Sequence, residues 1–197
     1  MPNGSCWSKV IPILQDAGHS VVAVQLPLTS IADDAATARR ATDKFDAPVV
    51  VVGHSFGGVV ITQAAYMAPN VSALVYVAAF APDANESAAD LVGRFPALES
   101  AKYIVVDKSG FSAFPQDQFP RLFGQDVDPV EARVLAAVQD PRMPRVSPSS
   151  PDHRHGGSIR PGMSSLKETG SSIPTSSAGW PSGWRQRRPQ CPVLATP

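Results

Sequence analysis

Short apolar runs alternate with amphipathic segments over the first eighty residues of the chain. The runs at 20–26, 47–53 and 72–82 are rich in Val, Ala and Leu, and glycine, proline or polar residues bound them. Such continuous runs are typical of strands covered on both faces in a parallel sheet. The segments between them, 28–45 and 56–68, carry apolar residues at helical spacing. This order predicts an α/β fold with a parallel sheet and right-handed crossovers.

Local signals predict where the first two helices begin and end. Gly18 is placed to end a helix near the N-terminus, because glycine adopts the left-handed conformation that closes many helices. Thr29 or Ser30 is placed to cap the start of the second helix. Asp33 and Asp34 fall in its first turns, where negative charge favours the helix dipole.

Residues 83–140 change character and predict a cap over an active site. Short helical patterns occur at 87–95 and 128–140. Between them, 102–114 reads as a β-hairpin that turns at Lys108-Ser109-Gly110. An insertion of this size after a core strand suits a lid.

From residue 141 onward neither a strand-like nor a helix-like hydrophobic period persists. Residues 1–140 carry a net charge of −6 and residues 141–197 a net charge of +6, and the tail holds half of the prolines. Such a difference argues against a single folding unit. We therefore expect a core at 1–82, a cap at 83–140, and a basic tail at 141–197 that is disordered or foreign to the fold. A core of only about three strands predicts low stability or aggregation.

The whole-chain composition excludes several classes of function. The formal net charge is zero, so nothing favours nucleic acid or an anionic membrane as a partner. The apolar runs are short of a membrane span, and no signal-peptide pattern opens the chain. Only Cys6 and Cys191 are present, which favours a reduced, cytoplasmic setting. No metal or organic cofactor is implied.

The sequence Gly-His-Ser-Phe-Gly at 53–57 carries the candidate chemistry. A serine nucleophile must sit on a sharp turn between a strand and a helix, so its neighbours two positions away must be small. Gly53 and Gly57 provide that room around Ser55, and Gly58 allows the helix to approach the sheet. The Phe56 amide, at the start of the helix, would donate to a developing oxyanion. The alternative is a tight strand–helix turn with no chemistry.

Three segments carry a resemblance to a known family: "GSCWSKVIPILQDAGHSVVAVQLPLTS", "VVVVGHSFGG" and "ALVYVAAFAPD". Together they resemble the α/β-hydrolase superfamily, and look closest to bacterial esterase-like members related to plant methyl esterases and hydroxynitrile lyases. The resemblance covers about residues 3–140. It implies Ser55 as nucleophile and Phe56 as one oxyanion donor. The family's second donor follows a His-Gly pair ahead of "GSCW", which this chain does not contain.

A serine nucleophile needs a base and an acid, and the resemblance implies that both follow the cap in the order Ser, Asp, His. His54 flanks the serine on the wrong side, and packing against the sheet is its expected role. His19 precedes the nucleophile and is expected at the surface. His153 and His155 lie beside Asp152 without a preceding strand, and form neither a credible triad nor a metal site. No triad acid or histidine is identified.

A frameshift near residue 140 is a hypothesis that explains the missing partners. Read one base earlier, the codons for 160–188 are compatible with "PSWYVVAKGDRIIHPDLQRWMAERMAATT", which resembles the family's acid-bearing segment. The codons for Ala195 and Thr196 could encode a histidine in that frame. The nucleotide sequence tests this. The alternative is a genuine Pro/Ser/Gly linker whose basic end, with Trp180 and Trp184, contacts acidic partners or RNA.

The sequence therefore predicts a partial α/β-hydrolase fold and a serine esterase that works through an acyl-enzyme at Ser55. The cap contains five phenylalanines that favour a small ester with an apolar acyl or aryl group: Phe95, Phe111, Phe114, Phe119 and Phe123. Two alternatives stay open. One is a hydroxynitrile-lyase-like enzyme of the same fold, and the other is a catalytically silent remnant or binding module. A serine at the elbow argues against a dehalogenase.

Overall fold

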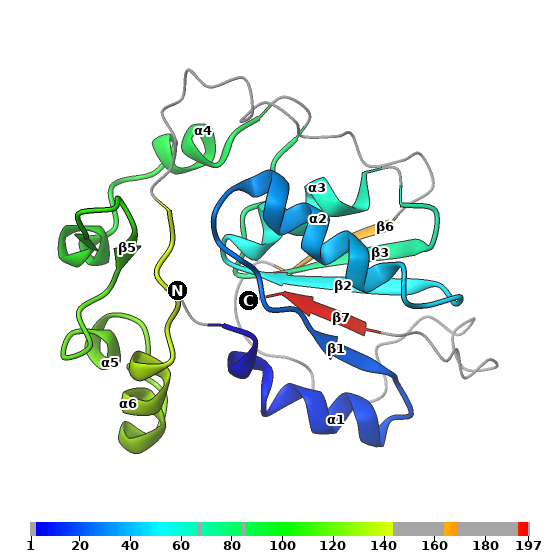
Figure 1. Ribbon diagram of the computed structural model, residues 1–197, viewed down its shortest axis with the longest axis horizontal. Coiled ribbons are helices and arrows are strands. Elements are labelled where there is room, and N and C mark those ends of the chain that lie inside the picture. The colour runs from blue at the N-terminus through cyan, green and yellow to red at the C-terminus, as the bar shows by residue number, and fades with distance from the viewer. Residues whose placement is uncertain (1–2, 67, 84–85, 144–163, 169–192, 197) are drawn as a thin grey trace.

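A five-stranded parallel sheet forms the centre of the molecule (Figure 1). The computed structural model describes residues 3–66, 68–83, 86–143, 164–168 and 193–196. The strand order is β1-β7-β2-β3-β6. The strands are β1 (Val21–Ala23), β2 (Val49–His54), β3 (Val71–Val77), β6 (Ser164–Glu168) and β7 (Val193–Thr196). The three apolar runs of the sequence thus become β1, β2 and β3, which confirms the predicted parallel α/β sheet.

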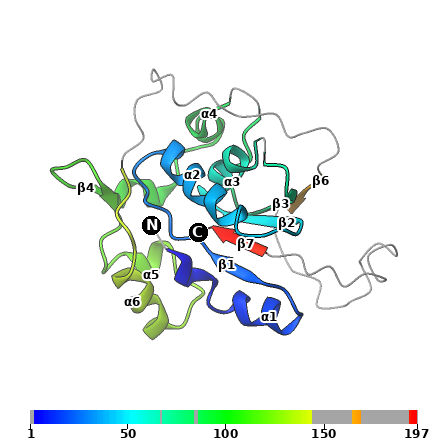
Figure 2. The ribbon, with the colours of Figure 1, turned by 45° about the vertical axis from the view of Figure 1, so that its right-hand side comes forward.

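Helices cover both faces of this sheet. Figures 1 and 2 show α2 (Ile31–Thr42) and α3 (Gly57–Ala65) on one side and α1 (Val10–Asp16) on the other. A 3₁₀ turn, η1 (Gly4–Trp7), precedes α1. Gly18, at φ +87°, ends the α1 turn as predicted. Every helix and strand expected up to residue 82 is therefore present, with limits a few residues shorter than the sequence indicated.

The core lies between the sheet and the pair α2 and α3. Val49, Val51 and Leu74 point into it from the strands, and Val60 and Ile61 of α3 are fully buried. Burying a branched apolar side chain of this size is worth about 1.5–3 kcal/mol, so this cluster holds α3 firmly against the end of β2. The position of α3 fixes the turn between β2 and α3.

The cap elements gather beside the edge of the sheet at which the strands end (Figures 1 and 2). The predicted helical pieces and hairpin are present, and η2 and α5 are added to them. The elements are α4 (Ala88–Gly93), η2 (Glu99–Tyr103), β4 (Val105–Val106), β5 (Ser112–Ala113), α5 (Phe119–Leu122) and α6 (Pro129–Ala137). Phe119 is fully buried and stacks near Phe123, with their ring centroids 5.2 Å apart. Phe95, in contrast, is 72% exposed, so it does not belong to the cap core.

The expectation that the core keeps only about three strands is wrong. β6 pairs with β3 at the edge of the sheet, and β7 lies between β1 and β2, both of which it pairs with in parallel. Both strands come from the segment after residue 141, which the sequence predicted to add none. β6 has five residues and β7 has four, too few to show a period of their own, and their pairing with β1, β2 and β3 defines them. The other tail positions singled out above, Trp180 and Trp184, lie outside the described residues.

The central place of β7 leads to a prediction about stability. Replacing Ala195 by proline is expected to lower the free energy of unfolding by about 2 kcal/mol, because proline removes a backbone donor from a strand paired on both sides. Ala195 is in register with Ala23 on one side and Val52 on the other. Urea unfolding followed by circular dichroism measures the change. Ala195→Val, which keeps the donor, is the matched control, and equal stability of the two variants would contradict the assigned position of β7.

Candidate active site

Ser55 occupies a strained turn between β2 and α3. β2 ends at His54, α3 begins at Gly57, and Ser55 adopts φ +53°. This left-handed conformation costs a residue with a side chain roughly 1–2 kcal/mol. Three backbone hydrogen bonds hold it: Ser55 donates to the Val77 carbonyl at 3.3 Å, and its own carbonyl accepts from Phe80 at 3.0 Å and Gly58 at 3.2 Å. The end of β3 therefore fixes the serine from the side.

Glycines make this turn sterically possible. A Cβ at Gly53 would lie 2.7 Å from the Gly57 carbonyl carbon and oxygen. A Cβ at Gly58 would lie only 2.1 Å from the carbonyl oxygen of Phe80. The steric need expected at Gly53 is thus present, and Gly58, which was expected to let the helix approach the sheet, packs against the chain that leaves β3.

Phe56 lies at the N-cap position of α3, with its side chain 6% exposed. Its carbonyl accepts from Val59 at 3.0 Å and from Val60 at 3.4 Å. Its amide donates to no acceptor among the described residues. An amide at a helix start carries a partial positive charge, so this N–H is suited to bind an anion or a developing oxyanion.

His54 packs toward the cap. Its ring makes an edge contact with Phe123, with centroids 6.2 Å apart and planes at 82°. Burial lowers the pKa of His54 below its ordinary value, so the ring is neutral at pH 7. The His54 ring was expected to pack against the sheet, but its edge contact with Phe123 joins the core to the cap.

The residues that should activate Ser55 are not brought to it in the described part of the chain. No hydrogen bond joins the Ser55 hydroxyl to a histidine or a carboxylate among the residues that the structure describes. His19 is half-buried at the end of α1. His153, His155 and Asp152 lie outside the described residues. The same part of the chain contains no group of three or more side chains able to hold a metal ion.

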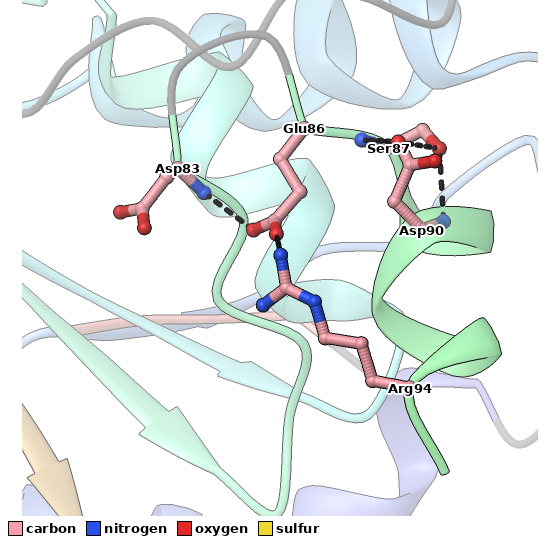
Figure 3. A network of polar contacts seen from close by, with 5 residues as sticks. All are labelled: Asp83, Glu86, Ser87, Asp90 and Arg94. Carbon is pink, nitrogen blue, oxygen red and sulfur yellow. Dashed lines mark hydrogen bonds and ion pairs between the residues drawn. The ribbon is translucent and has the colours of Figure 1, made fainter.

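The carboxylates at the start of the cap serve local structure (Figure 3). Glu86 forms an ion pair with Arg94, and its other oxygen accepts from the Asp83 amide at 2.9 Å. Ser87 and Asp90 form a reciprocal capping box at the start of α4. Glu86 and Asp90 are thus occupied in shaping the chain that follows β3, and neither is placed as an acid for a triad.

A buried aspartate, Asp34, supports the turn that leads into α2. Ser30 caps the helix and Asp33 accepts from its hydroxyl at 2.8 Å, but Asp34 is only 1% exposed. Its Oδ1 accepts from the amide of Leu28 at 2.7 Å, and Leu28 adopts φ +56°. The sequence had assigned both aspartates to the helix dipole. Burial separates them in the structure: Asp33 faces the cap residue Ser30, whereas Asp34 is enclosed and accepts from Leu28.

The pKa of Asp34 gives a prediction about pH. Burial raises this pKa from its ordinary 3.8 to about 6, against the Leu28 hydrogen bond and the charge of Arg142, which lower it; Asp33 adds a smaller rise. A carboxyl whose folded pKa exceeds its unfolded value binds its proton more tightly in the folded state. Its contribution to stability is therefore present below about pH 4 and is lost as the pH rises to about 6.

Asp34→Asn keeps an oxygen acceptor for Leu28 and removes the charge. We expect this variant to be more stable than the parent at pH 7 by on the order of 1 kcal/mol, because no charge has to be buried, with the difference shrinking toward pH 4. Asp33→Asn is the control with the opposite sign, because hydrogen bonds from Ser30 and Thr29 lower the pKa of Asp33. Urea midpoints between pH 4 and pH 7.5 measure both. An unchanged difference across that range would contradict the prediction.

A groove on the surface lies apart from the turn at Ser55. An open groove lined by Gln25, Asp33 and Arg40 runs along α2 and contains none of the residues around Ser55. No helix within the described ranges is long and apolar enough to cross a membrane.

Comparison with known proteins assigns the chain to a family that agrees with this fold. The sequence matches the alpha/beta hydrolase family over residues 2–191, and the chain belongs to that family. Among curated relatives, Methylesterase 1 of Arabidopsis thaliana is 31% identical over 150 residues, which cover 64% of this chain and 57% of that protein. The alpha-hydroxynitrile lyase of the same plant is 31% identical over 103 residues, 45% of this chain and 40% of that protein.

A solved structure supports the same fold. A crystal structure of polyneuridine aldehyde esterase superposes with a TM-score of 0.61 at 22% identity, over 72% of this chain and 65% of that chain. The chain therefore has the α/β-hydrolase fold and spans less than two thirds of the length of these relatives.

Proposed function

We propose that this chain is a serine hydrolase that acts on carboxylic esters through Ser55. The observation that carries the proposal is the left-handed Ser55 at the end of β2, followed directly by the Phe56 amide, which donates to no acceptor in the described part of the chain. A strained strand–helix turn of this kind exposes a hydroxyl at the edge of the sheet and places a donor beside it. The similarity to proteins named as esterases favours an ester as the substrate.

In the proposed reaction the Ser55 hydroxyl oxygen attacks the ester carbonyl carbon. The Phe56 amide donates to the oxyanion that forms. The tetrahedral intermediate collapses to an acyl-enzyme as the alcohol leaves with the serine proton, and water then releases the acid. Because no base is hydrogen-bonded to Ser55 within the described ranges, turnover is expected to be slow. In other serine hydrolases, removal of a triad residue lowers kcat by about 10⁴- to 10⁶-fold.

The cap favours an apolar substrate. Phe114, Phe119 and Phe123 form a ring cluster, and Phe123 contacts His54 beside the nucleophile. We propose that acyl or aryl groups of small esters pack against this cluster, because aromatic side chains commonly line such pockets. Nitrophenyl esters of increasing acyl length compare the preference directly.

The test of the proposal is covalent labelling by a fluorophosphonate, which reacts with activated serines, followed by mass spectrometry of the digested protein. We expect the label on the peptide that contains Ser55. A folded protein that takes up no label would favour the second candidate, a catalytically silent binding module. That candidate is supported by the lack, among the described residues, of a base hydrogen-bonded to Ser55. Release of cyanide from a cyanohydrin would favour the lyase alternative, which rests on the similarity to the hydroxynitrile lyase.

A further inference from the structure

We propose that Arg142 is a positioning residue that holds Phe56, the candidate oxyanion donor, and adds positive charge beside its amide. The inference rests on the proposed function of Ser55 and goes beyond it, because it assigns a role to a residue that the sequence had placed in the tail. It concerns a contact between the end of the cap and the start of α3.

The contact is direct. The guanidinium carbon of Arg142 lies 3.4 Å from the centroid of the Phe56 ring. A guanidinium stacked on an aromatic face is attracted by the ring, and the attraction grows when water is excluded. Phe56 is 6% exposed, so the face in contact with Arg142 is shielded from solvent.

The backbone of Arg142 is fixed from two sides. Its amide donates to the Ser112 carbonyl at 2.9 Å, and its carbonyl accepts from the Ser112 amide at 2.6 Å and from the Ser112 hydroxyl at 3.1 Å. The next residue, Met143, donates to the Leu28 carbonyl at 3.0 Å. Asp34 in turn holds Leu28 in its left-handed conformation. The cap hairpin and the core turn together therefore aim the guanidinium at Phe56.

The consequence for chemistry is electrostatic as well as steric. The Phe56 amide stands at the start of α3, where the helix dipole is positive. A guanidinium on the ring of the same residue adds a positive charge nearby, and because Arg142 is half-buried that charge is screened less than one in open water. Both favour the negative oxygen of a tetrahedral intermediate over the neutral carbonyl of the substrate. The Asp34 carboxyl, which interacts with Arg142, balances part of this charge.

Two variants separate charge from packing. Arg142→Met keeps an unbranched stem of similar reach without charge, and Arg142→Lys keeps the charge without the planar group. For each, the labelling of Ser55 by a neutral fluorophosphonate is followed at several concentrations, which gives the maximal labelling rate and the half-saturating concentration. We expect Arg142→Met to lower the maximal rate about tenfold with little change in half-saturation, and Arg142→Lys to recover part of the loss.

A double-mutant cycle tests whether the effect of Arg142 on labelling passes through Phe56. Phe56→Leu keeps the amide and an apolar side chain but removes the aromatic face, so Arg142→Met should have a smaller effect in that background. If Arg142→Met does not fold by circular dichroism, Arg142→Lys in the two backgrounds supplies the same comparison. A folded Arg142→Met with the parental labelling rate would overturn the inference and leave the role of Ser55 intact. No label on Ser55 in the parent protein would overturn the proposed function, and this inference with it.

Discussion

Replacing Ser55 by alanine is expected to abolish fluorophosphonate labelling and all ester turnover above that of buffer. The variant removes only the hydroxyl oxygen that attacks, and it keeps the three backbone hydrogen bonds that shape the turn. Labelling followed by intact mass spectrometry measures the loss. Ser109→Ala, at the exposed turn of the β4–β5 hairpin, is the matched control and should label like the parent.

A second substitution at Ser55 tests the strain that the proposal assigns to it. Alanine keeps the cost of φ +53°, whereas glycine adopts this conformation freely. Ser55→Gly should therefore lose labelling as Ser55→Ala does, yet exceed it in stability by about 1 kcal/mol, or roughly 2–4 °C in the midpoint of thermal unfolding. Two variants of equal stability would show that the turn carries no strain. Retained labelling in either would place the nucleophile elsewhere.

The part of the fold around Ser55 could be predicted because local signals and tertiary packing agree there. The apolar run of β2 is buried on alternate residues, the glycines meet backbone atoms at close range, and Ser30 caps α2 as its position indicated. In this region local propensity, steric need and core packing all favour the same arrangement.

Other features depend on contacts between residues distant in the sequence. β7 is recognisable only through its neighbours, because four residues between prolines show no period. Arg142 stands 86 positions after Phe56 and reaches it through pairing with Ser112. Asp34 differs from Asp33 in burial, which neither residue type nor spacing reveals. Sequence patterns indicate which face of a helix or strand is apolar, whereas these roles depend on contacts with residues that are distant in the sequence.

Replacing Gly58 by alanine is expected to lower the free energy of unfolding by about 3–4 kcal/mol, the largest stability change predicted for this chain. The added Cβ would lie 2.1 Å from the Phe80 carbonyl oxygen and 2.9 Å from the Ala79 Cβ, and neither atom is the end of a flexible side chain. Either α3 or the chain after β3 has to move. Thermal unfolding by circular dichroism should show a midpoint lower by roughly 6–16 °C.

The same clash should reach the nucleophile. Phe80 donates to the Ser55 carbonyl, so moving Phe80 away from α3 loosens the residue that fixes the turn. Labelling of Ser55 in Gly58→Ala is therefore expected to slow even at temperatures where the variant is folded. Gly93→Ala is the matched control, because a Cβ at the end of α4 meets no atom within 4 Å. That control should be neutral or slightly stabilising, since alanine favours helix over glycine by up to about 1 kcal/mol. A Gly58→Ala variant with parental stability and labelling rate would contradict this prediction. The close approach of α3 to the chain after β3 would then not be what holds Ser55 in its left-handed conformation.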